Sequence, residues 1–206
     1  MKGKYIVIEG ADGTGKSTQL ALLAEHLASK NIEYVEFSEP DGTPISNEIR
    51  AIIKNGSLER EAETNLLLFT AARHEIWKHV ALPALEQDKC VIASRNYYST
   101  LVYQGYAEGL SLKSIETITR EFTGDRYVNP DISMILSLPE HSTRMKRINH
   151  RGTLKNVDTF ENKGVEFQDK LHSGYLSLAK SKNIPVIDAN QSIDAVFLEI
   201  LSKIHT

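Results

Sequence analysis

The stretch Gly10-Ala11-Asp12-Gly13-Thr14-Gly15-Lys16-Ser17 decides the fold of this 206-residue chain. It fits the pattern G-x-x-x-x-G-K-[ST], in which glycines allow successive backbone N–H groups to converge on phosphate oxygens. An apolar run precedes it at 5–8, and apolar residues with helical spacing follow it between 17 and 30. A strand, a glycine loop and a helix in this order predict a phosphate-binding P-loop at a helix N-terminus.

The loop residues have separate predicted roles toward a bound nucleotide. We expect Lys16 to reach the β- and γ-phosphates, and the Ser17 hydroxyl to ligate a Mg²⁺ ion that bridges them. The other residues assigned to the nucleotide phosphates are Gly10, Ala11, Asp12, Gly13, Thr14, Gly15 and Thr18. A P-loop alone does not separate an ATPase, a GTPase and a kinase. A GTPase usually carries an N-K-x-D motif that reads the base, and the sequence contains none.

Apolar runs alternate with helical patterns along the rest of the chain. The predicted strands are 5–8, 34–37, 91–93, 132–138 and 184–187. The predicted helices are 17–30, 45–53, 61–86 and 193–204. Pro83 is expected to bend the helical region 61–86 or to divide it in two. A further helix is predicted from the helical spacing of Phe160, Phe167, Leu171, Tyr175 and Leu178. This alternation predicts one α/β domain over residues 1–206, with a five-stranded parallel sheet between two layers of helices. Ligands of such folds lie beyond the carboxyl ends of the strands.

Composition narrows the class of protein further. Hydrophobic residues make up 41% and charged residues 25%, as in ordinary globular proteins, which argues against a disordered or fibrous chain. The net charge of -3 argues against a nucleic-acid binder. Cys90 is the only cysteine, and its apolar neighbours predict a buried structural thiol. No apolar stretch approaches membrane-spanning length, so we expect no membrane partner and a reducing, cytoplasmic location.

Several segments, in order along the chain, resemble the thymidylate kinase family. The resemblance runs from Ile6 to about Leu201 and includes an acidic residue at the Asp12 position of the P-loop. The other segments that carry it are FSEPDGTPI at 37–45, LLFTAAR at 67–73, SRN at 94–96, STLVYQG at 99–105, PDI at 130–132 and VIDANQSI at 186–193. The resemblance implies a three-layer P-loop NTPase fold, transfer of the γ-phosphoryl group of ATP to dTMP with Mg²⁺ as cofactor, and a homodimer.

The resemblance also implies an acceptor site. It assigns Arg95 to the acceptor phosphate, with Arg50 as second candidate, because guanidinium groups match oxyanions. Phe69 would stack on thymine, although by itself it would be interpreted as a core aromatic, and Arg73 would donate to a thymine carbonyl. Thr100 and Gln104, four residues apart, would share a helix face toward the base. The remaining assignments are Tyr103 against the sugar 2′ position, Asp12 on the 3′-OH or the metal, Glu39 near the acceptor phosphate and Mg²⁺, and Pro40, Ser99 and Tyr175 around dTMP.

A basic run from Arg144 to Lys155 is either a solvated face or a lid over ATP, extending to about residue 158. One style of the family carries an arginine where this chain has Gly13, and the other supplies the cation from the lid. The resemblance therefore implies a lid cation, with Arg151 the first candidate for stabilising the transition state and Arg147 the second. It also places Arg144 over the adenine, with Asn190 and Gln191 beside it.

The chain departs from the family pattern at four polar positions. Ser94 and Ser137 stand where aspartates are usual, and Ser38 and Thr159 stand where arginines are usual. These changes predict a slower enzyme, a different acceptor, or compensation by Asp12, Glu39, Asp158 or Glu161. A deoxynucleoside kinase and a nucleotide-binding protein without catalysis therefore remain alternatives to a thymidylate kinase.

Overall fold

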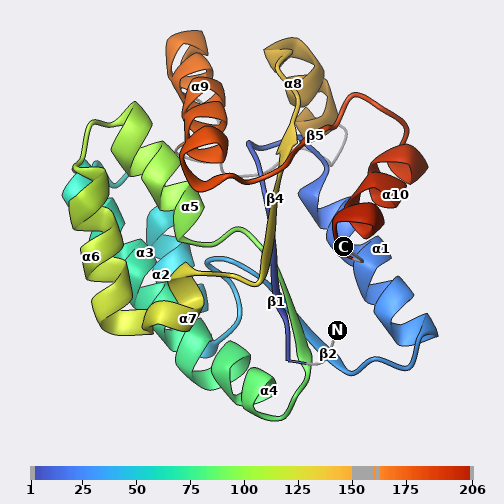
Figure 1. Cartoon of the computed structure of the whole chain (residues 1–206). Helices are drawn as coiled ribbons and strands as arrows, with labels where there is room; N and C mark the ends of the chain where they lie inside the picture. Colours follow the sequence, from blue (N-terminus) through green and yellow to red (C-terminus); the bar gives the residue numbers. More distant parts are fainter. Residues whose placement is uncertain (1–2, 150–159, 161–162, 205–206) are drawn as a thin grey trace.

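The computed structural model describes residues 3–149, 160 and 163–204. These residues form a five-stranded sheet in the order β2-β3-β1-β4-β5, and all four pairings are parallel. The strands, drawn in Figure 1, are β1 (Tyr5–Glu9), β2 (Tyr34–Ser38), β3 (Cys90–Ser94), β4 (Ile132–Ser137) and β5 (Val186–Asp188). The prediction of an α/β fold with a five-stranded parallel sheet is confirmed.

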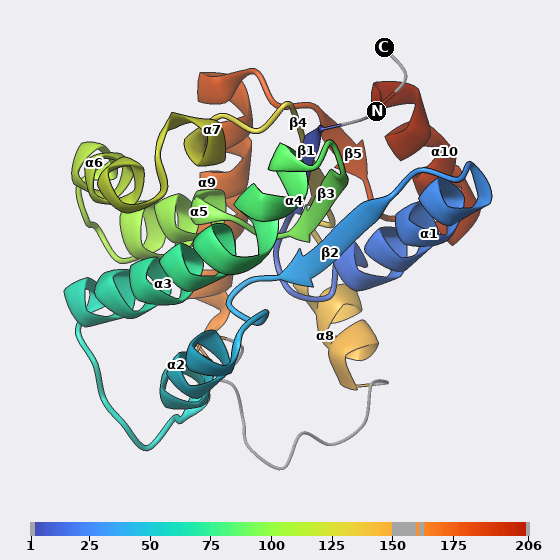
Figure 2. The ribbon, with the colours of Figure 1, turned by 90° about the horizontal axis from the view of Figure 1, so that it is seen from below.

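Helices cover both faces of this sheet, as Figures 1 and 2 show. The α-helices are α1 (Lys16–Ser29), α2 (Pro44–Lys54), α3 (Ala62–Ile76), α4 (Leu82–Glu86), α5 (Tyr97–Thr100), α6 (Leu112–Thr123), α7 (Asp125–Val128), α8 (His141–Asn149), α9 (Val165–Lys182) and α10 (Ile193–Ile204). Two π-helical turns, η1 (Trp77–Ala81) and η2 (Leu101–Ala107), interrupt this series. Helices α1 and α10 lie on one face, and α3, α5, α6 and α9 lie on the other.

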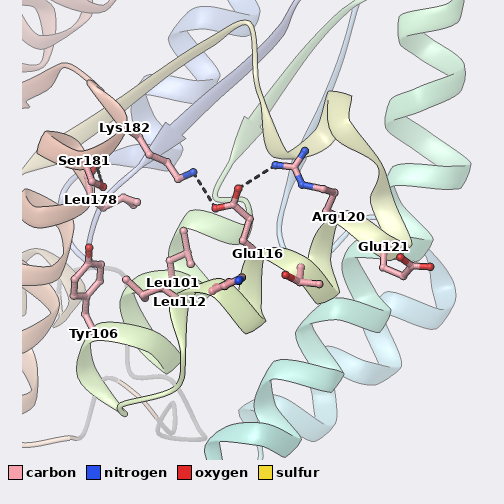
Figure 3. A pocket seen from close by; sticks show the side chains of 11 residues that line it. Leu101, Tyr106, Leu112, Glu116, Arg120, Glu121, Leu178, Ser181 and Lys182 are labelled. Carbon is pink, nitrogen blue, oxygen red and sulfur yellow. Dashed lines mark hydrogen bonds and ion pairs between the residues drawn. The ribbon is translucent and has the colours of Figure 1, made fainter.

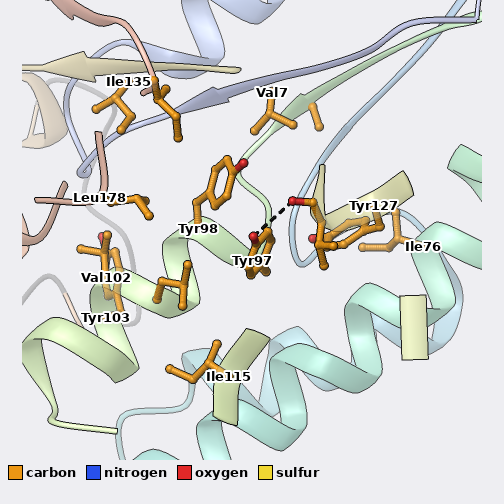
Figure 4. Packing of buried hydrophobic residues seen from close by; sticks show 14 of the residues in the cluster. Val7, Ile76, Tyr97, Tyr98, Val102, Tyr103, Ile115, Tyr127, Ile135 and Leu178 are labelled. Carbon is orange, nitrogen blue, oxygen red and sulfur yellow. Dashed lines mark hydrogen bonds between the residues drawn. The ribbon is translucent and has the colours of Figure 1, made fainter. Parts of the chain in front are cut away.

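The central strand β1 shows why its sequence is apolar throughout. Successive side chains of a strand point to opposite faces. Tyr5 and Val7 therefore enter the core beneath α3, α5 and α9, whereas Ile6 and Ile8 enter the core beneath α1 and α10. Figure 4 shows the first of these cores, in which the rings of Tyr97 and Tyr127 pack below β1. Burial on both faces explains the continuous apolar run.

One sequence-based element assignment agrees with the structure and another needs correction. The helical region expected over 61–86, bent or divided at Pro83, is present as α3, η1 and α4, and the π-helical turn η1 ends just before the segment that contains Pro83. Because proline has no N–H, the i→i−4 ladder cannot continue through it, and Pro83 lies in the first turn of α4. Phe160 does not belong to the helix that follows it. It lies in a turn, and α9 begins at Val165, directly after Gly164.

Cys90 is the first residue of β3 and is fully buried, as its apolar neighbours predicted. Burial raises the pKa of its thiol to about 11, so the group is unreactive at neutral pH. Among the helices of the described residues, none combines the length and the apolar character that a bilayer crossing requires.

Candidate active site

A cavity of about 290 Å³ lies beyond the carboxyl ends of β1 and β3. Its wall includes Asp12, Lys16 and Ser17 from the P-loop and the start of α1. Phe69 and Arg73 of α3 also line it. The P-loop therefore shares one cavity with the residues assigned to the base.

A second cavity of about 690 Å³ lies between η2, α6 and α9, and Figure 3 shows its walls. Its main charged groups neutralise one another. Glu116 accepts from Arg120 Nη2 at 3.0 Å and from Lys182 Nζ at 3.1 Å. No P-loop residue lines this cavity. We therefore place the candidate active site in the first cavity.

The P-loop connects β1 to α1 in a conformation that directs Lys16 over the loop. Helix α1 begins at Lys16, and its cap Gly15 has a φ of 95°, in the left-handed region that favours glycine. The Lys16 ammonium donates to the carbonyl oxygens of Gly10 and Ala11, each at 2.8 Å. Charge on the ammonium and the N-terminal dipole of α1 make this end of the cavity an anion site.

The other loop residues differ in their surroundings. The Thr14 hydroxyl donates to the Ala11 carbonyl and braces the loop. Ser17 is exposed and lines the cavity, whereas Thr18 is exposed and lies outside its wall. Ser17 is thus the loop hydroxyl placed to contact a ligand or an ion there.

Gly13 lies against the backbone of α8. A Cβ built on Gly13 would lie 2.7 Å from the carbonyl oxygen of Arg144 and 2.9 Å from its Cα. The φ of Gly13 is 81°, which also disfavours any side chain. In this arrangement the space that an arginine would need at position 13 is filled by α8.

We expect Gly13→Ala to destabilise the protein more than Gly15→Ala does. Both positions have positive φ, which costs an alanine about 1 to 2 kcal/mol. A Cβ on Gly15 would meet nothing within 4 Å, so only Gly13→Ala adds steric overlap, for a further ~1 to 3 kcal/mol. Urea unfolding of both variants measures the difference in the free energy of unfolding. Equal losses would show that α8 does not rest on the loop.

Arg95 lines the cavity, and its guanidinium group donates to three side chains. Its Nη2 donates to Asp12 Oδ1 at 2.6 Å, and its Nη1 donates to Ser99 Oγ at 2.8 Å and to the Tyr175 hydroxyl at 3.3 Å. The guanidinium carbon also lies 5.5 Å from the centre of the Tyr103 ring, within cation–π range. These contacts fix the direction of the guanidinium group.

Asp12 receives Arg95 on one oxygen and the Tyr103 hydroxyl, at 3.2 Å, on the other. Burial would raise the pKa of the Asp12 carboxyl, but the charges of Arg95 and Lys16 outweigh it and hold that pKa well below its usual range. Asp12 is therefore ionised at neutral pH. Because the family pattern already includes an acid at this position, compensation for Ser94 by Asp12 stays a prediction.

Glu9 is a buried acid that the sequence interpretation did not assign to the site. Its carboxylate accepts from the backbone N–H groups of Gly10 (3.2 Å), Asn96 (2.9 Å) and Ser99 (3.1 Å), and from the Tyr175 hydroxyl (3.0 Å). It thus ties the end of β1 to the segment after β3 and to α9. An acid directly after four buried apolar residues was the available signal.

The far end of the cavity is built around Arg73, whose side chain is 1% exposed. Its Nε donates to Glu39 Oε2 at 3.1 Å and to the Tyr127 hydroxyl at 2.7 Å, and its Nη2 donates to Thr100 Oγ1 at 3.0 Å. Nη1 has no hydrogen-bond partner within the described part of the chain. The structure therefore leaves one buried donor of Arg73 for a ligand of the cavity it lines.

Glu39 orients this arginine. One of its oxygens accepts from Arg73, and the other accepts from the Tyr127 hydroxyl at 2.5 Å. Burial raises the pKa of Glu39 in spite of the opposing effects of Arg73 and Tyr127. Both oxygens are already engaged by protein groups, which favours a positioning role, and metal binding by Glu39 stays a prediction. Tyr127 belongs to none of the motifs, so no sequence pattern indicated its contact.

The remaining residues assigned to the acceptor lie around the same cavity. Pro40, Arg50, Phe69, Ser99, Thr100, Tyr103 and Gln104 all line it. Phe69 packs against Phe160, with ring centres 6.3 Å apart. Arg50 pairs with Asp41 at 3.0 Å near the cavity mouth, where both side chains are more than a third exposed. Tyr175 is not part of the wall, and its hydroxyl contacts Arg95 and Glu9.

The predicted lid begins as the helix α8. The Arg144 guanidinium is buried and donates from Nη1 to the carbonyl oxygens of Leu138 (2.6 Å) and Pro139 (3.2 Å). Arg147 donates to the Ala189 carbonyl at 3.1 Å. Arg147 thereby joins α8 to the segment with Asn190 and Gln191, which are both exposed. The lid positions Arg151, Lys155, Asp158, Thr159 and Glu161 lie outside the described residues.

The donor set of the site suits Mg²⁺ held largely by substrate. Within 3–149, 160 and 163–204, no three His, Cys, Asp or Glu side chains gather as a metal cluster. Magnesium in phosphate sites commonly takes one or two protein oxygens together with phosphate oxygens and water. The exposed Ser17 hydroxyl fits that pattern, whereas both oxygens of the Asp12 carboxylate already accept from Arg95 and Tyr103, so metal binding by Asp12 stays a prediction.

Comparison with known proteins gives consistent matches. The family model described as thymidylate kinase matches residues 8–200. The thymidylate kinase of Kosmotoga olearia is 37% identical over 201 residues, covering 97% of this chain and 94% of that protein. The thymidylate kinase of Pseudoalteromonas translucida is 36% identical over 208 residues, covering 100% and 97%. The crystal structure of thymidylate kinase from Ehrlichia chaffeensis matches with a TM-score of 0.80 and 28% identity, covering 100% of both chains.

Proposed function

This chain belongs to the thymidylate kinase family, and from that premise we propose that its cavity transfers the γ-phosphoryl group of ATP to dTMP, giving dTDP and ADP. We propose further that residues 1–206 act as one kinase domain. One observation carries the assignment of the site. Arg95 lines the same cavity as the anion-binding P-loop, the aromatic ring of Phe69 and the buried Arg73.

In this proposal each end of the cavity binds its own substrate. Lys16 and the N-terminus of α1 attract the β- and γ-phosphates of ATP. Arg95 is directed by Asp12, Ser99 and Tyr175 to receive the phosphate of the acceptor, and Phe69 offers a ring for the base. A nucleoside monophosphate supplies both a phosphate for Arg95 and a flat base for Phe69, whereas a free nucleoside has no anion for Arg95 to bind. The site therefore favours a thymidylate kinase over a deoxynucleoside kinase.

The reaction needs positioning and charge more than covalent help from the protein. An oxygen of the dTMP phosphate attacks the γ-phosphorus, the bond from that phosphorus to the β-bridging oxygen breaks, and ADP leaves. Lys16 contacts the β- and γ-phosphates, which separate in the reaction. Arg95 reduces the repulsion between the dTMP phosphate and the γ-phosphate. Asp12 keeps Arg95 in place, and it is our candidate to accept from the sugar 3′-OH or to help hold the metal. Arg151 and then Arg147 stay our candidates for the lid cation.

When bound, Mg²⁺ supplies charge that neutralises the β- and γ-phosphate oxygens. Ser17 would hold it, with Asp12 as the second oxygen donor. Arg144, Asn190 and Gln191 remain our candidates for the adenine.

The proposal is tested by measuring ADP release with Mg·ATP and dTMP, dUMP, dCMP, dGMP or thymidine. We expect release with dTMP far above that with the other acceptors. Release with thymidine alone would establish a deoxynucleoside kinase. Binding of Mg·ATP without turnover on any acceptor would establish a protein without catalysis.

We also propose a homodimer in the cytoplasm. Leu67 of α3 and Phe122 of α6 are 60% and 52% exposed, and these two helices pack side by side. Exposed apolar side chains on two neighbouring helices suit contact with a second copy. Sedimentation velocity is expected to give about twice the 23.1 kDa chain mass. A single species at the chain mass would exclude the dimer.

A further inference from the structure

Gln104 is a fully buried amide in the wall of the cavity. Its Nε2 donates to Glu108 Oε2 at 3.1 Å, one helical turn further along the chain. Its Oε1 has no hydrogen-bond partner among the residues that the structure describes. A buried carbonyl oxygen without a partner is costly, so this atom marks a place where a ligand donor would be stabilising.

The orientation of this amide follows from the chemistry of Glu108. A carboxylate only accepts hydrogen bonds, so the NH₂ group of Gln104 must face it and the carbonyl oxygen must face elsewhere. Glu108 is itself anchored, because its Oε1 accepts from the Lys163 ammonium. Lys163 in turn lies 4.5 Å from the ring centre of Phe167 and 5.3 Å from that of Phe160. Lys163 and Glu108 therefore fix which end of the amide remains for the ligand.

Arg73 supplies the complementary group. Its Nη1 is a buried donor without a partner in the described part of the chain, and it belongs to the same cavity wall. A donor from Arg73 and an acceptor from Gln104 match the edge of a pyrimidine with a carbonyl at C4 and a hydrogen on N3. Cytosine carries an amino group at C4 and an unprotonated acceptor nitrogen at N3. Its C4 amino donor would therefore face the Arg73 donor, and its N3 acceptor would face the Gln104 acceptor.

We propose that Glu108, anchored by Lys163, is a positioning residue that sets the amide of Gln104 to accept from N3–H and so selects thymine or uracil against cytosine. This inference rests on the proposed function, because it concerns the base of the acceptor. Glu108 touches no reacting atom and acts through Gln104.

Glu108→Ala and Lys163→Met test the proposal through ratios of kcat/KM. With Glu108→Ala, the amide turns freely, and we expect the preference for dTMP over dCMP to fall about tenfold, mainly through KM, as for loss of one buried hydrogen bond. Lys163→Met should lower the same preference about threefold, since Glu108 remains. The dTMP to dUMP ratio should not change, because both bases carry N3–H. Glu116→Ala is the matched control, since Glu116 also pairs with a lysine but lies at the other cavity (Figure 3).

An unchanged dTMP to dCMP ratio in Glu108→Ala would overturn the proposal. If that variant does not fold, Lys163→Met carries the same test, and an unchanged ratio there would overturn it. A failure of the proposed function looks different, since the unaltered protein would then release no ADP with dTMP.

Discussion

Arg95→Met is expected to lower kcat/KM for dTMP by about 10³, because removal of a preorganised cationic donor at a transferring phosphate costs that order of rate. Arg95 is the cation between the P-loop and the base end, and its two hydrogen-bonding nitrogens are already directed by Asp12, Ser99 and Tyr175. Methionine keeps much of the side-chain length and removes the charge. Coupled measurement of ADP release at varied dTMP gives the change.

Arg126→Met is the control for Arg95→Met. Arg126 is also an arginine with a hydrogen bond, but its partner is the Gly3 carbonyl, at the amino end of β1 and away from the cavity. We expect its kcat/KM to stay within about twofold of the unaltered protein, as for an exposed residue outside the site. A similar kcat/KM for Arg95→Met and Arg126→Met would remove Arg95 from the mechanism.

Arg73→Met is expected to lower the free energy of unfolding by about 3 to 5 kcal/mol, because it leaves the Glu39 carboxylate buried without its cation. The side chains of this pair are 1% and 5% exposed. Lys4→Met breaks a pair with Asp131 whose side chains are 49% and 32% exposed, so it should cost no more than about 1 kcal/mol. Urea unfolding at pH 7 compares the two variants.

The loss in Arg73→Met should depend on pH in a defined direction. Burial already raises the pKa of Glu39, and loss of Arg73 removes an interaction that opposes this rise. An acid whose pKa is higher in the folded state than in the unfolded state costs stability as pH rises through that range. The deficit should therefore be smaller at pH 5 than at pH 8.

The double variant Arg73→Met with Glu39→Gln separates the charge from the packing. It should recover part of the lost stability, because the uncompensated charge is gone. A double variant no more stable than Arg73→Met, with a deficit that does not vary with pH, would show that Glu39 is not the cause.

The sequence was sufficient for the framework of the site because the P-loop is a local feature. The glycine loop, the buried strand before it and the helix after it depend on neighbours in sequence, and they lie where the pattern placed them. One cavity is lined by the motif residues Arg73, Arg95 and Gln104. This could be predicted because the segments that follow parallel strands meet at the carboxyl edge of the sheet, where ligands bind.

The supporting contacts could not be predicted, because they join distant segments. Tyr127 meets Arg73 across 54 positions and Glu39 across 88, and it lies in a four-residue helix without a motif. Lys163 meets Glu108 across 55 positions. Asp12 meets Arg95 from 83 positions away, and no local pattern indicated that contact. The effect of Ser94 on the reaction stays a prediction.

Calorimetric titration of dTMP and of thymidine into the protein and into Arg95→Met tests the central claim most directly. If Arg95 receives the acceptor phosphate, the unaltered protein should bind dTMP at least about 10²-fold more tightly than thymidine, as for a charge-assisted, bidentate contact with phosphate. Arg95→Met should lose most of this advantage while its affinity for thymidine stays the same. An advantage for dTMP that persists in Arg95→Met, or equal binding of dTMP and thymidine by the unaltered protein, would contradict the account.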